Sequence, residues 1–173
     1  MYNKIVITGS VGTGKTTIAK LLAERLKMKV IHVSDFVKKK HIYSKIVDGE
    51  LIVKMNELKK ELNKLNNVIL ESHLLCEFKL SDAIVIVLRC RPEILEERLK
   101  KRAYSEDKIR ENLEAEALDY CSIKAVENYG DSRVYEIDVS NLSPESAVEE
   151  ILKILSGKRK SDEVDFSGYL LKE

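Results

Sequence analysis

Residues 9–16 read Gly9-Ser10-Val11-Gly12-Thr13-Gly14-Lys15-Thr16 and match the pattern G-x-x-x-x-G-K-[ST]. The apolar run Ile5-Val6-Ile7 before them is typical of a short buried strand, and residues 17–26 after them have the apolar spacing of a helix. Strand, glycine-rich loop and helix in this order are the context in which the pattern forms a phosphate-binding loop, or Walker A motif. We therefore predict that residues 9–16 bind the phosphates of a nucleoside triphosphate.

The residue types in this loop suit that chemistry. Glycines let backbone N–H groups approach phosphate oxygens, and the helix that follows points the positive end of its dipole at the same anion. Lys15 is expected to reach the β- and γ-phosphates, and Thr16 to place its hydroxyl on Mg²⁺. The alternative is a turn that only links strand to helix, which the combined spacing of glycines, lysine and hydroxyl disfavours.

The composition predicts one ordinary globular domain. The chain has 173 residues, of which 44% are hydrophobic and 34% charged, and its net charge of +1 gives no overall sign of nucleic-acid binding. Cys76, Cys90 and Cys121 are widely spaced and odd in number, which argues against a disulfide framework or a structural zinc site. The longest apolar run, residues 83–88, is too short to cross a membrane, and Met1 leads directly toward a strand. We therefore expect a cytoplasmic protein without a secretory signal.

Apolar strand-like runs alternate with helical segments along the chain. This alternation predicts a three-layer α/β fold around a parallel sheet. A helix is expected from Pro92 to about Arg102, and one long helix from the N-cap Ser105 to near Gly130. Ser143 is expected to cap a last helix that Gly157 closes, and the apolar residues of the tail either stay loose or dock. The expected strands are residues 5–7, 30–33, 68–70, 84–88 and 134–137.

Two classes of nucleotide-binding protein are excluded by their missing motifs. A guanine-specific GTPase needs N-K-x-D, and Asn63-Lys64-Leu65-Asn66 lacks the aspartate. A dinucleotide site needs G-x-G-x-x-G, and residues 12–17 end in threonine instead. A small phosphate-binding domain without a further module fits a kinase that acts on a nucleotide or a small metabolite.

Such a kinase needs an acceptor site, an acidic group behind Mg²⁺ and cations over the moving phosphoryl group. Asp35 follows the second expected strand, where an acceptor segment should begin, although it could instead cap a helix. Glu71 ends the third expected strand, at the place of an acidic Walker B group. His73 lies two residues further on, at the sheet edge where ligands bind, although it could be a surface histidine without a role.

Arginines gather around the fourth expected strand and the helix after it. Arg98 and Arg102 are four residues apart and share a helix face, and a planar guanidinium can bind two phosphoryl oxygens at once. Arg89 lies at the end of the strand itself. The alternative is a set of surface ion pairs with the glutamates of the same helix. Arg102 is favoured as a lid residue because it ends the helix.

With these residues in place, the chain resembles the adenylate kinase isoenzyme six family, small phosphate-binding-loop kinases tied to ribosome assembly, and in particular an archaeal-type member. The resemblance covers about residues 1–155. Its strongest part after the phosphate-binding loop is similar to that family's short lid and lid helix. The matching stretches are residues 8–17, Val33-Ser34-Asp35, Glu71-Ser72-His73, Val87-Leu88-Arg89 and residues 97–116.

The resemblance implies the fold of nucleoside monophosphate kinases and the reaction ATP + AMP ⇌ 2 ADP with Mg²⁺, together with ATP hydrolysis. It also implies binding to a small-subunit platform ribosomal protein. The kinase domain would cover residues 1–155, with an acceptor region at about 32–53, a lid at about 101–111, and a tail at 156–173.

The resemblance and the residues together assign roles within this site. Catalytic roles fall to Lys15, Glu71, His73, Arg98 and Arg102. ATP would be bound by Gly12, Gly14, Lys15, Thr16, Thr17 and Arg102; the acceptor by Asp35, Lys38 and Arg89; and the metal by Thr16 and Glu71.

Three departures from the family pattern bear on these roles. Glu71 stands where aspartate is usual and adds a methylene; Ala103 stands where a glycine follows the lid arginine; and Lys38 replaces an arginine and would bind phosphate less directionally. Residues 36–60 hold no clear signature for reading AMP. Two other functions therefore stay open: an ATPase switch for assembly, in which His73 orients the attacking water, and a kinase for another small acceptor.

Overall fold

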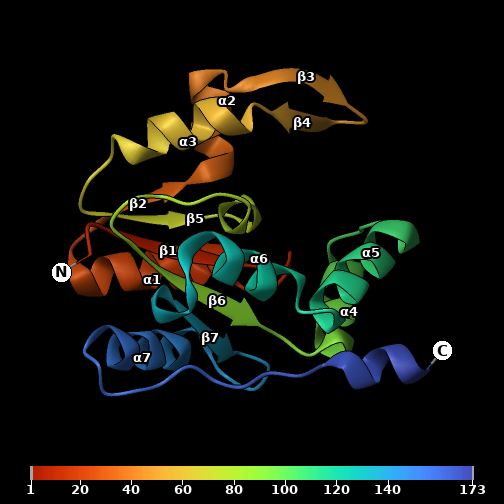
Figure 1. Ribbon diagram of the computed structural model, residues 1–173. Coiled ribbons are helices and arrows are strands. Elements are labelled where there is room, and N and C mark those ends of the chain that lie inside the picture. The colour runs from red at the N-terminus through yellow and green to blue at the C-terminus, as the bar shows by residue number, and fades with distance from the viewer. Residues whose placement is uncertain (1, 173) are drawn as a thin grey trace.

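Five parallel strands form the central sheet of the computed structural model, which describes residues 2–172 (Figure 1). Their order across the sheet is β2-β5-β1-β6-β7, so the strand that enters the phosphate-binding loop lies at the centre. The strands are β1 (Lys4–Gly9), β2 (Lys29–His32), β5 (Val68–Glu71), β6 (Ala83–Arg89) and β7 (Val134–Asp138). The predicted α/β fold with a parallel sheet is confirmed, and all five expected strands are present, although Val33 begins a helix instead of ending β2.

Helices cover both faces of this sheet. They are α1 (Lys15–Leu26), α2 (Val33–Lys40), α3 (Met55–Asn63), α4 (Pro92–Lys101), α5 (Glu106–Ala117), α6 (Tyr120–Tyr129) and α7 (Pro144–Leu155). Short 3₁₀ helices are η1 (His73–Cys76), η2 (Asp131–Arg133) and η3 (Ser167–Lys172), and a separate hairpin is formed by β3 (Tyr43–Val47) and β4 (Glu50–Val53).

Alternation along β1 divides the apolar interior into two cores. Side chains of successive strand residues point to opposite faces. Ile5 and Ile7 therefore pack with α1, α4, α5 and α7, whereas Val6 packs with α2, α3 and α6 on the other face. Every residue of β1 and β6 is buried, as expected for strands covered on both sides. The central strands are thus a rigid base for the loop that leaves β1.

The expected helix ends are largely confirmed. The Ser105 hydroxyl accepts from the backbone N–H of Lys108, and the Ser143 hydroxyl accepts from that of Ser146. Each serine satisfies a donor that the first helical turn leaves free. Gly157 adopts a φ of +71° just beyond α7, the left-handed conformation that closes many helices.

The expected single helix from Ser105 to Gly130 is wrong. The chain forms α5 and α6 instead, and Asp119 between them has a left-handed φ of +55°. The break lets both the Glu116 carbonyl oxygen and the Asp119 carboxylate accept hydrogen bonds from the buried Arg89 guanidinium. A buried cation without partners would be costly, and we attribute the break in the helix to this cation's need for partners.

The tail docks, which decides between the two alternatives left open by the sequence. Asp162 and Ser161 form hydrogen bonds with the backbone of β7 at Glu136, and η3 packs against α5. The Phe166 ring lies 5.4 Å from the Arg89 guanidinium carbon. The tail therefore covers the outer edge of the sheet. Within residues 2–172, no helix has the length and apolar character needed to span a membrane.

Candidate functional site

The phosphate-binding loop joins β1 to α1 and is held open by glycine backbone. Gly9, Gly12 and Gly14 have φ values of +139°, +90° and +94°, a region that other residues rarely adopt. A Cβ atom on Gly9 would lie 2.5 Å from the carbonyl oxygen of Leu88 on β6. The loop therefore leaves the sheet so close to the neighbouring strand that only glycine fits.

Lys15 folds back over this loop. Its Nζ donates hydrogen bonds to the carbonyl oxygens of Gly9 and Ser10, at 2.9 and 2.8 Å. Burial lowers the pKa of Lys15 to about 8, although Glu71 and other acidic neighbours oppose the shift. A partly desolvated ammonium group held at the loop by two carbonyl oxygens is suited to contact the β- and γ-phosphates.

Glu71 and Thr16 come together at the carboxyl end of the sheet. The Thr16 hydroxyl donates to Glu71 Oε1 at 3.2 Å, and His32 Nδ1 lies 2.8 Å from the same oxygen. A hydroxyl and a carboxylate are oxygen ligands of the kind Mg²⁺ prefers, and Mg²⁺ bound with nucleotide usually needs few protein ligands. This pair therefore fits a nucleotide-bound Mg²⁺. A fully protein-built centre is not seen, since no group of three His, Cys, Asp or Glu suited to a metal occurs within residues 2–172.

His73 is the first residue of η1, directly beyond β5, and its side chain is exposed. Displacement of water by surrounding protein atoms lowers its pKa, and the charge of Lys15 lowers it further. A neutral imidazole at neutral pH can accept a proton. The predicted location of His73 at the carboxyl edge of the sheet thus agrees with the structure, while its catalytic role stays a prediction.

Arg98 on α4 and Arg102 at its C-terminal cap lie near the loop. Arg98 Nη1 donates to the Gly12 carbonyl oxygen at 3.0 Å. Arg102, the exposed residue that ends α4, is near enough for its charge to lower the pKa of Lys15. The structure therefore gathers three cations, Lys15, Arg98 and Arg102, around the place where the β- and γ-phosphates are expected.

The predicted acceptor residues of α2 lie on the surface. Asp35 and Lys38 are both exposed and three residues apart, so they share a helix face. The helix begins with His32 as its N-cap, so the alternative that Asp35 caps it is wrong. Thr17, on α1, is exposed next to Thr16. The roles of Asp35 and Lys38 in acceptor binding and of Thr17 in ATP binding stay predictions.

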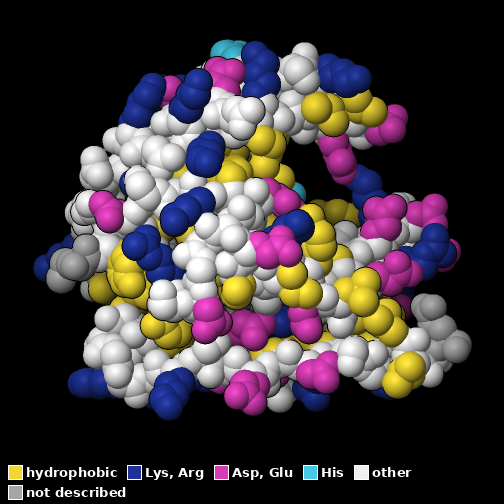
Figure 2. Space-filling view, viewed as in Figure 1, with side chains coloured by type: hydrophobic (Ala, Val, Ile, Leu, Met, Phe, Trp, Pro, Cys, Tyr) yellow, Lys and Arg dark blue, Asp and Glu magenta, His cyan; other side chains and the backbone are white. Residues whose placement is uncertain are grey.

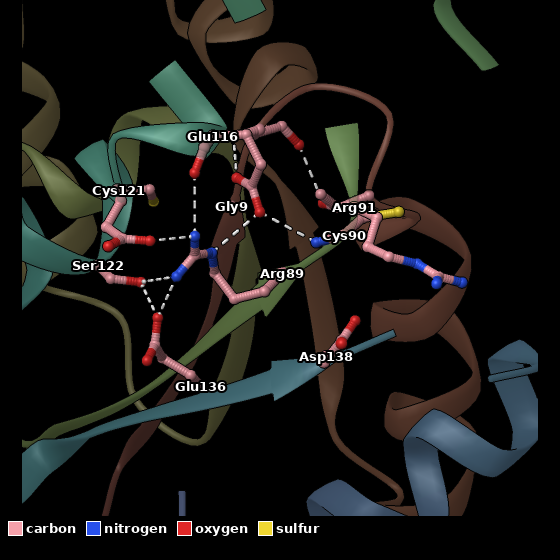
Figure 3. Close-up of polar contacts among 12 residues, drawn as sticks. Gly9, Arg89, Cys90, Arg91, Glu116, Cys121, Ser122, Glu136 and Asp138 are labelled. Atoms are coloured by element: carbon pink, nitrogen blue, oxygen red, sulfur yellow. Dashed lines mark hydrogen bonds and ion pairs between the residues drawn. The ribbon is translucent and has the colours of Figure 1, made fainter. Parts of the chain in front are cut away.

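Arg89 occupies a different setting from the other arginines. Its side chain is fully buried at the centre of a polar cluster (Figure 3), where it pairs with the carboxylates of Glu116, Asp119 and Glu136. Burial alone would lower the pKa of Arg89, but the charge of Glu116 and the hydrogen bonds to the carboxylates outweigh it and raise the pKa. Its N–H groups thus donate hydrogen bonds to oxygen atoms of the protein itself. Acceptor binding by Arg89 stays a prediction.

The same cluster reaches the phosphate-binding loop. The Ser10 hydroxyl donates to Glu116 Oε2 at 2.5 Å, and the backbone N–H of Cys90 donates to Glu116 Oε1 at 3.0 Å. Glu116 therefore links α5 to both the loop and the end of β6. Nothing in the local sequence marks this glutamate. The position of His32 at the end of a strand next to Glu71 could have been noticed only once the strand order was known.

The β3–β4 hairpin and α5, which are expected to belong to the acceptor region and the lid, lie near each other. In Figure 1, β3–β4 and α5 both lie on the side toward which the sheet strands point, and Figure 2 shows a hollow between these two parts of the surface. Lys108 of α5 forms an ion pair with Glu50 of β4, which bridges the two. The expected acceptor region and lid thus lie on the same side of the sheet and are joined by this ion pair.

Comparison with known proteins agrees with this architecture. Residues 5–119 match the family model described as "AAA domain". A protein of Pyrococcus abyssi named "Putative adenylate kinase" is 43% identical over 169 residues, covering 94% of this chain and 91% of its own. A protein of the same name from Methanothermobacter thermautotrophicus is 40% identical over 174 residues, covering 96% of this chain and 99% of its own.

Solved structures with a similar fold include a shikimate kinase and a gluconokinase. Shikimate kinase from Acinetobacter baumannii in complex with shikimate aligns with a TM-score of 0.66 and 20% identity, covering 92% of this chain and 97% of its own. A gluconokinase from Sinorhizobium meliloti aligns with a TM-score of 0.57 and 16% identity, covering 90% and 92%. At these identities the likeness concerns the fold alone.

The family assignment follows from these matches. The family model spans more than half of the chain, and the two archaeal relatives cover nearly all of it. The narrower resemblance to the isoenzyme six family stays a prediction. The chain belongs to the AAA-domain family and to the adenylate kinase-like family of phosphate-binding-loop proteins that these archaeal relatives represent.

Proposed function

We propose that this protein is an Mg²⁺-dependent nucleoside monophosphate kinase that catalyses ATP + AMP ⇌ 2 ADP. The observation that carries the proposal is that Lys15 and Arg98 both bond the phosphate-binding loop, with the charge of Arg102 and the Thr16–Glu71 pair close by. The name of the archaeal relatives supports adenylate as the nucleotide.

The chemistry needs positioning and charge more than proton transfer. An oxygen of the AMP phosphate attacks the γ-phosphorus of ATP, the bond from the γ-phosphorus to the β–γ bridging oxygen breaks, and ADP leaves. The attacking phosphate is already an anion, so no general base is required. Lys15, Arg98 and Arg102 would neutralise charge on the moving group, and their charges act strongly where the lid excludes water.

Thr16 and Glu71 are the residues that would hold Mg²⁺ with the nucleotide. The ion neutralises and orients the β- and γ-phosphates when bound. Glu71 keeps the charge of the more usual aspartate and already contacts the Thr16 hydroxyl. The acceptor would lie against residues 32–53, where Asp35 and Lys38 are exposed on α2 and Lys38 could pair with the AMP phosphate.

The test is ADP formation from ATP, AMP and Mg²⁺, compared with ATP and Mg²⁺ alone. We expect AMP to raise the rate by well over tenfold, Lys15→Met to abolish it, and Lys38→Ala to raise the KM for AMP while leaving ATP hydrolysis unchanged. If AMP adds nothing, the adenylate kinase proposal is lost. A parallel series with other nucleoside monophosphates and small hydroxylated metabolites would then identify another acceptor.

ATP hydrolysis is a second candidate activity, favoured by the position of His73. This exposed histidine follows Glu71 by two residues, and the nearby charge of Lys15 lowers its pKa. It could therefore orient a water toward the γ-phosphate. His73→Ala should lower hydrolysis about tenfold or more, and equal rates would remove this role. The link to small-subunit assembly and its platform ribosomal protein rests on the family resemblance alone and stays a prediction.

A further inference from the structure

Two neighbouring strands of the sheet end side by side at the candidate metal site. β2 ends at His32 and β5 ends at Glu71, and these two residues are partners in the parallel register. Their side chains meet with 2.8 Å between His32 Nδ1 and Glu71 Oε1. Only 19% of the His32 side chain and 9% of the Glu71 side chain are exposed. The contact is therefore a semi-buried hydrogen bond built by the sheet itself.

We propose that His32 is a positioning residue that fixes the Glu71 carboxylate for the metal-bound nucleotide. A glutamate has one more rotatable bond than the aspartate usual at this position, so its carboxylate can swing unless something holds it. His32 and Thr16 both contact Oε1, from two different elements, and neither contact uses Oε2. The pair of contacts holds the longer side chain in one orientation.

The direction of the hydrogen bond follows from the partners. An ionised carboxylate can only accept, so the proton in this contact belongs to His32 Nδ1. Residues that orient a metal-binding carboxylate commonly change metal affinity by about 10-fold to 100-fold when they are replaced. His32 acts in the same way on Glu71, through the hydrogen bond and not through contact with substrate.

The inference rests on the proposed Mg²⁺–nucleotide site but not on the identity of the acceptor. Its test is therefore the affinity for an ATP analogue with a non-hydrolysable β–γ linkage, measured by calorimetry with Mg²⁺ and again with EDTA. His32→Asn and His32→Leu are matched in shape, and only asparagine retains an N–H close to the place of Nδ1. His41→Asn is a control, because His41 is exposed at the end of α2 in a left-handed conformation that asparagine tolerates.

Mg²⁺ should raise the affinity of the unmodified protein for the analogue, and we expect this gain to be about tenfold smaller in His32→Leu, with the affinity in EDTA unchanged. His32→Asn and the His41 control should keep the full gain. An undiminished gain in His32→Leu, an equal loss in His32→Asn, or a parallel loss in EDTA would each overturn the proposal. If His32→Leu does not fold, His32→Ala is measured against the same expectations. Because the analogue cannot transfer its γ-phosphoryl group and no AMP is added, failure of the adenylate kinase reaction leaves the result unaffected.

Discussion

Single residues of the phosphate-binding loop carry constraints that can be tested one at a time. Gly9 has a φ of +139°, and a Cβ there would lie 2.5 Å from the Leu88 carbonyl oxygen. We expect Gly9→Ala to lower the free energy of unfolding by at least about 2 kcal/mol, measured by urea denaturation. Gly157→Ala is the control, because Gly157 also has a positive φ but open space around it, so strain alone should cost about 1 kcal/mol.

Lys15 gives the site a pH dependence whose sign can be worked out. Burial lowers its pKa to about 8 in the free protein, and a bound phosphate favours the charged form. Below that pKa the lysine is already protonated, so ADP binds without taking up a proton. Above it, binding must restore the proton. ADP affinity in EDTA should therefore fall above about pH 8, approaching tenfold per pH unit.

The arginine variant is the control for this dependence. The arginine in Lys15→Arg stays protonated across the whole range. The ADP affinity of this variant, whether strong or weak, should therefore not change between about pH 7 and pH 10. A flat profile in the unmodified protein would contradict the assignment of the slope to Lys15. Calorimetry or fluorescence titration at each pH supplies the measurement.

Some residues of this site could be predicted from the sequence and others could not, for a physical reason. Residues 9–16 are local in the chain, and their spacing alone specifies a phosphate-binding loop. Glu71 and His73 could be assigned from their place after a strand. His32 and Glu116 contact the site only through strand pairing and helix packing, which bring distant residues together. Such contacts leave no periodic or spacing signal in a single sequence.

Secondary-structure elements are joined by the buried cluster around Arg89. This one side chain binds Glu116 of α5, Asp119 between α5 and α6, and Glu136 of β7. The same cluster explains why one expected helix is two. Side-chain periodicity continues through residues 105–130, so the sequence predicted a single helix. We attribute the break in the helix to the carboxylate and carbonyl oxygens that the buried Arg89 guanidinium binds there, which a continuous helix would not present.

We expect Arg89→Met to lower the free energy of unfolding by about 3–5 kcal/mol, because it leaves buried carboxylates without their cation. Arg91→Met is the matched control. Arg91 is exposed, and its guanidinium bonds Asn141 at the surface, so its loss should change stability by about 0.5 kcal/mol or less. Thermal and urea denaturation of the two variants separate the outcomes. Equal losses in both would mean that the cluster contributes no more than a surface contact.

At the scale of the whole molecule, the tail closes the open edge of the sheet. Residues Ser161 and Asp162 bond the backbone of β7, and Lys172 pairs with Glu93 of α4. An uncovered edge strand offers free N–H and C=O groups to other chains. A chain ending at Gly157 should therefore unfold at a lower temperature and associate at high concentration, as measured by calorimetry and light scattering. A monomeric truncated chain of unchanged stability would show that the tail has no covering role.

The arrangement of lid and hairpin over the site leads to a prediction about their separation. Lys108 and Glu50 form an exposed ion pair between α5 and β4, and such pairs are worth up to about 1 kcal/mol at low salt. That energy shifts a closed–open equilibrium by about fivefold at most. Lys108→Met should therefore lengthen the mean distance between the hairpin and α5.

This distance can be followed by energy transfer between labels at exposed positions, using Lys45→Cys on β3 and Glu111→Cys on α5. Cys76, Cys90 and Cys121 are buried, so labelling should favour the new sites. High salt should lengthen the distance in the parent protein and leave Lys108→Met unchanged, because screening and mutation remove the same attraction. Lys100→Met, which breaks an ion pair within α4, should behave like the parent. A salt response that persists in Lys108→Met would assign closure to other charges.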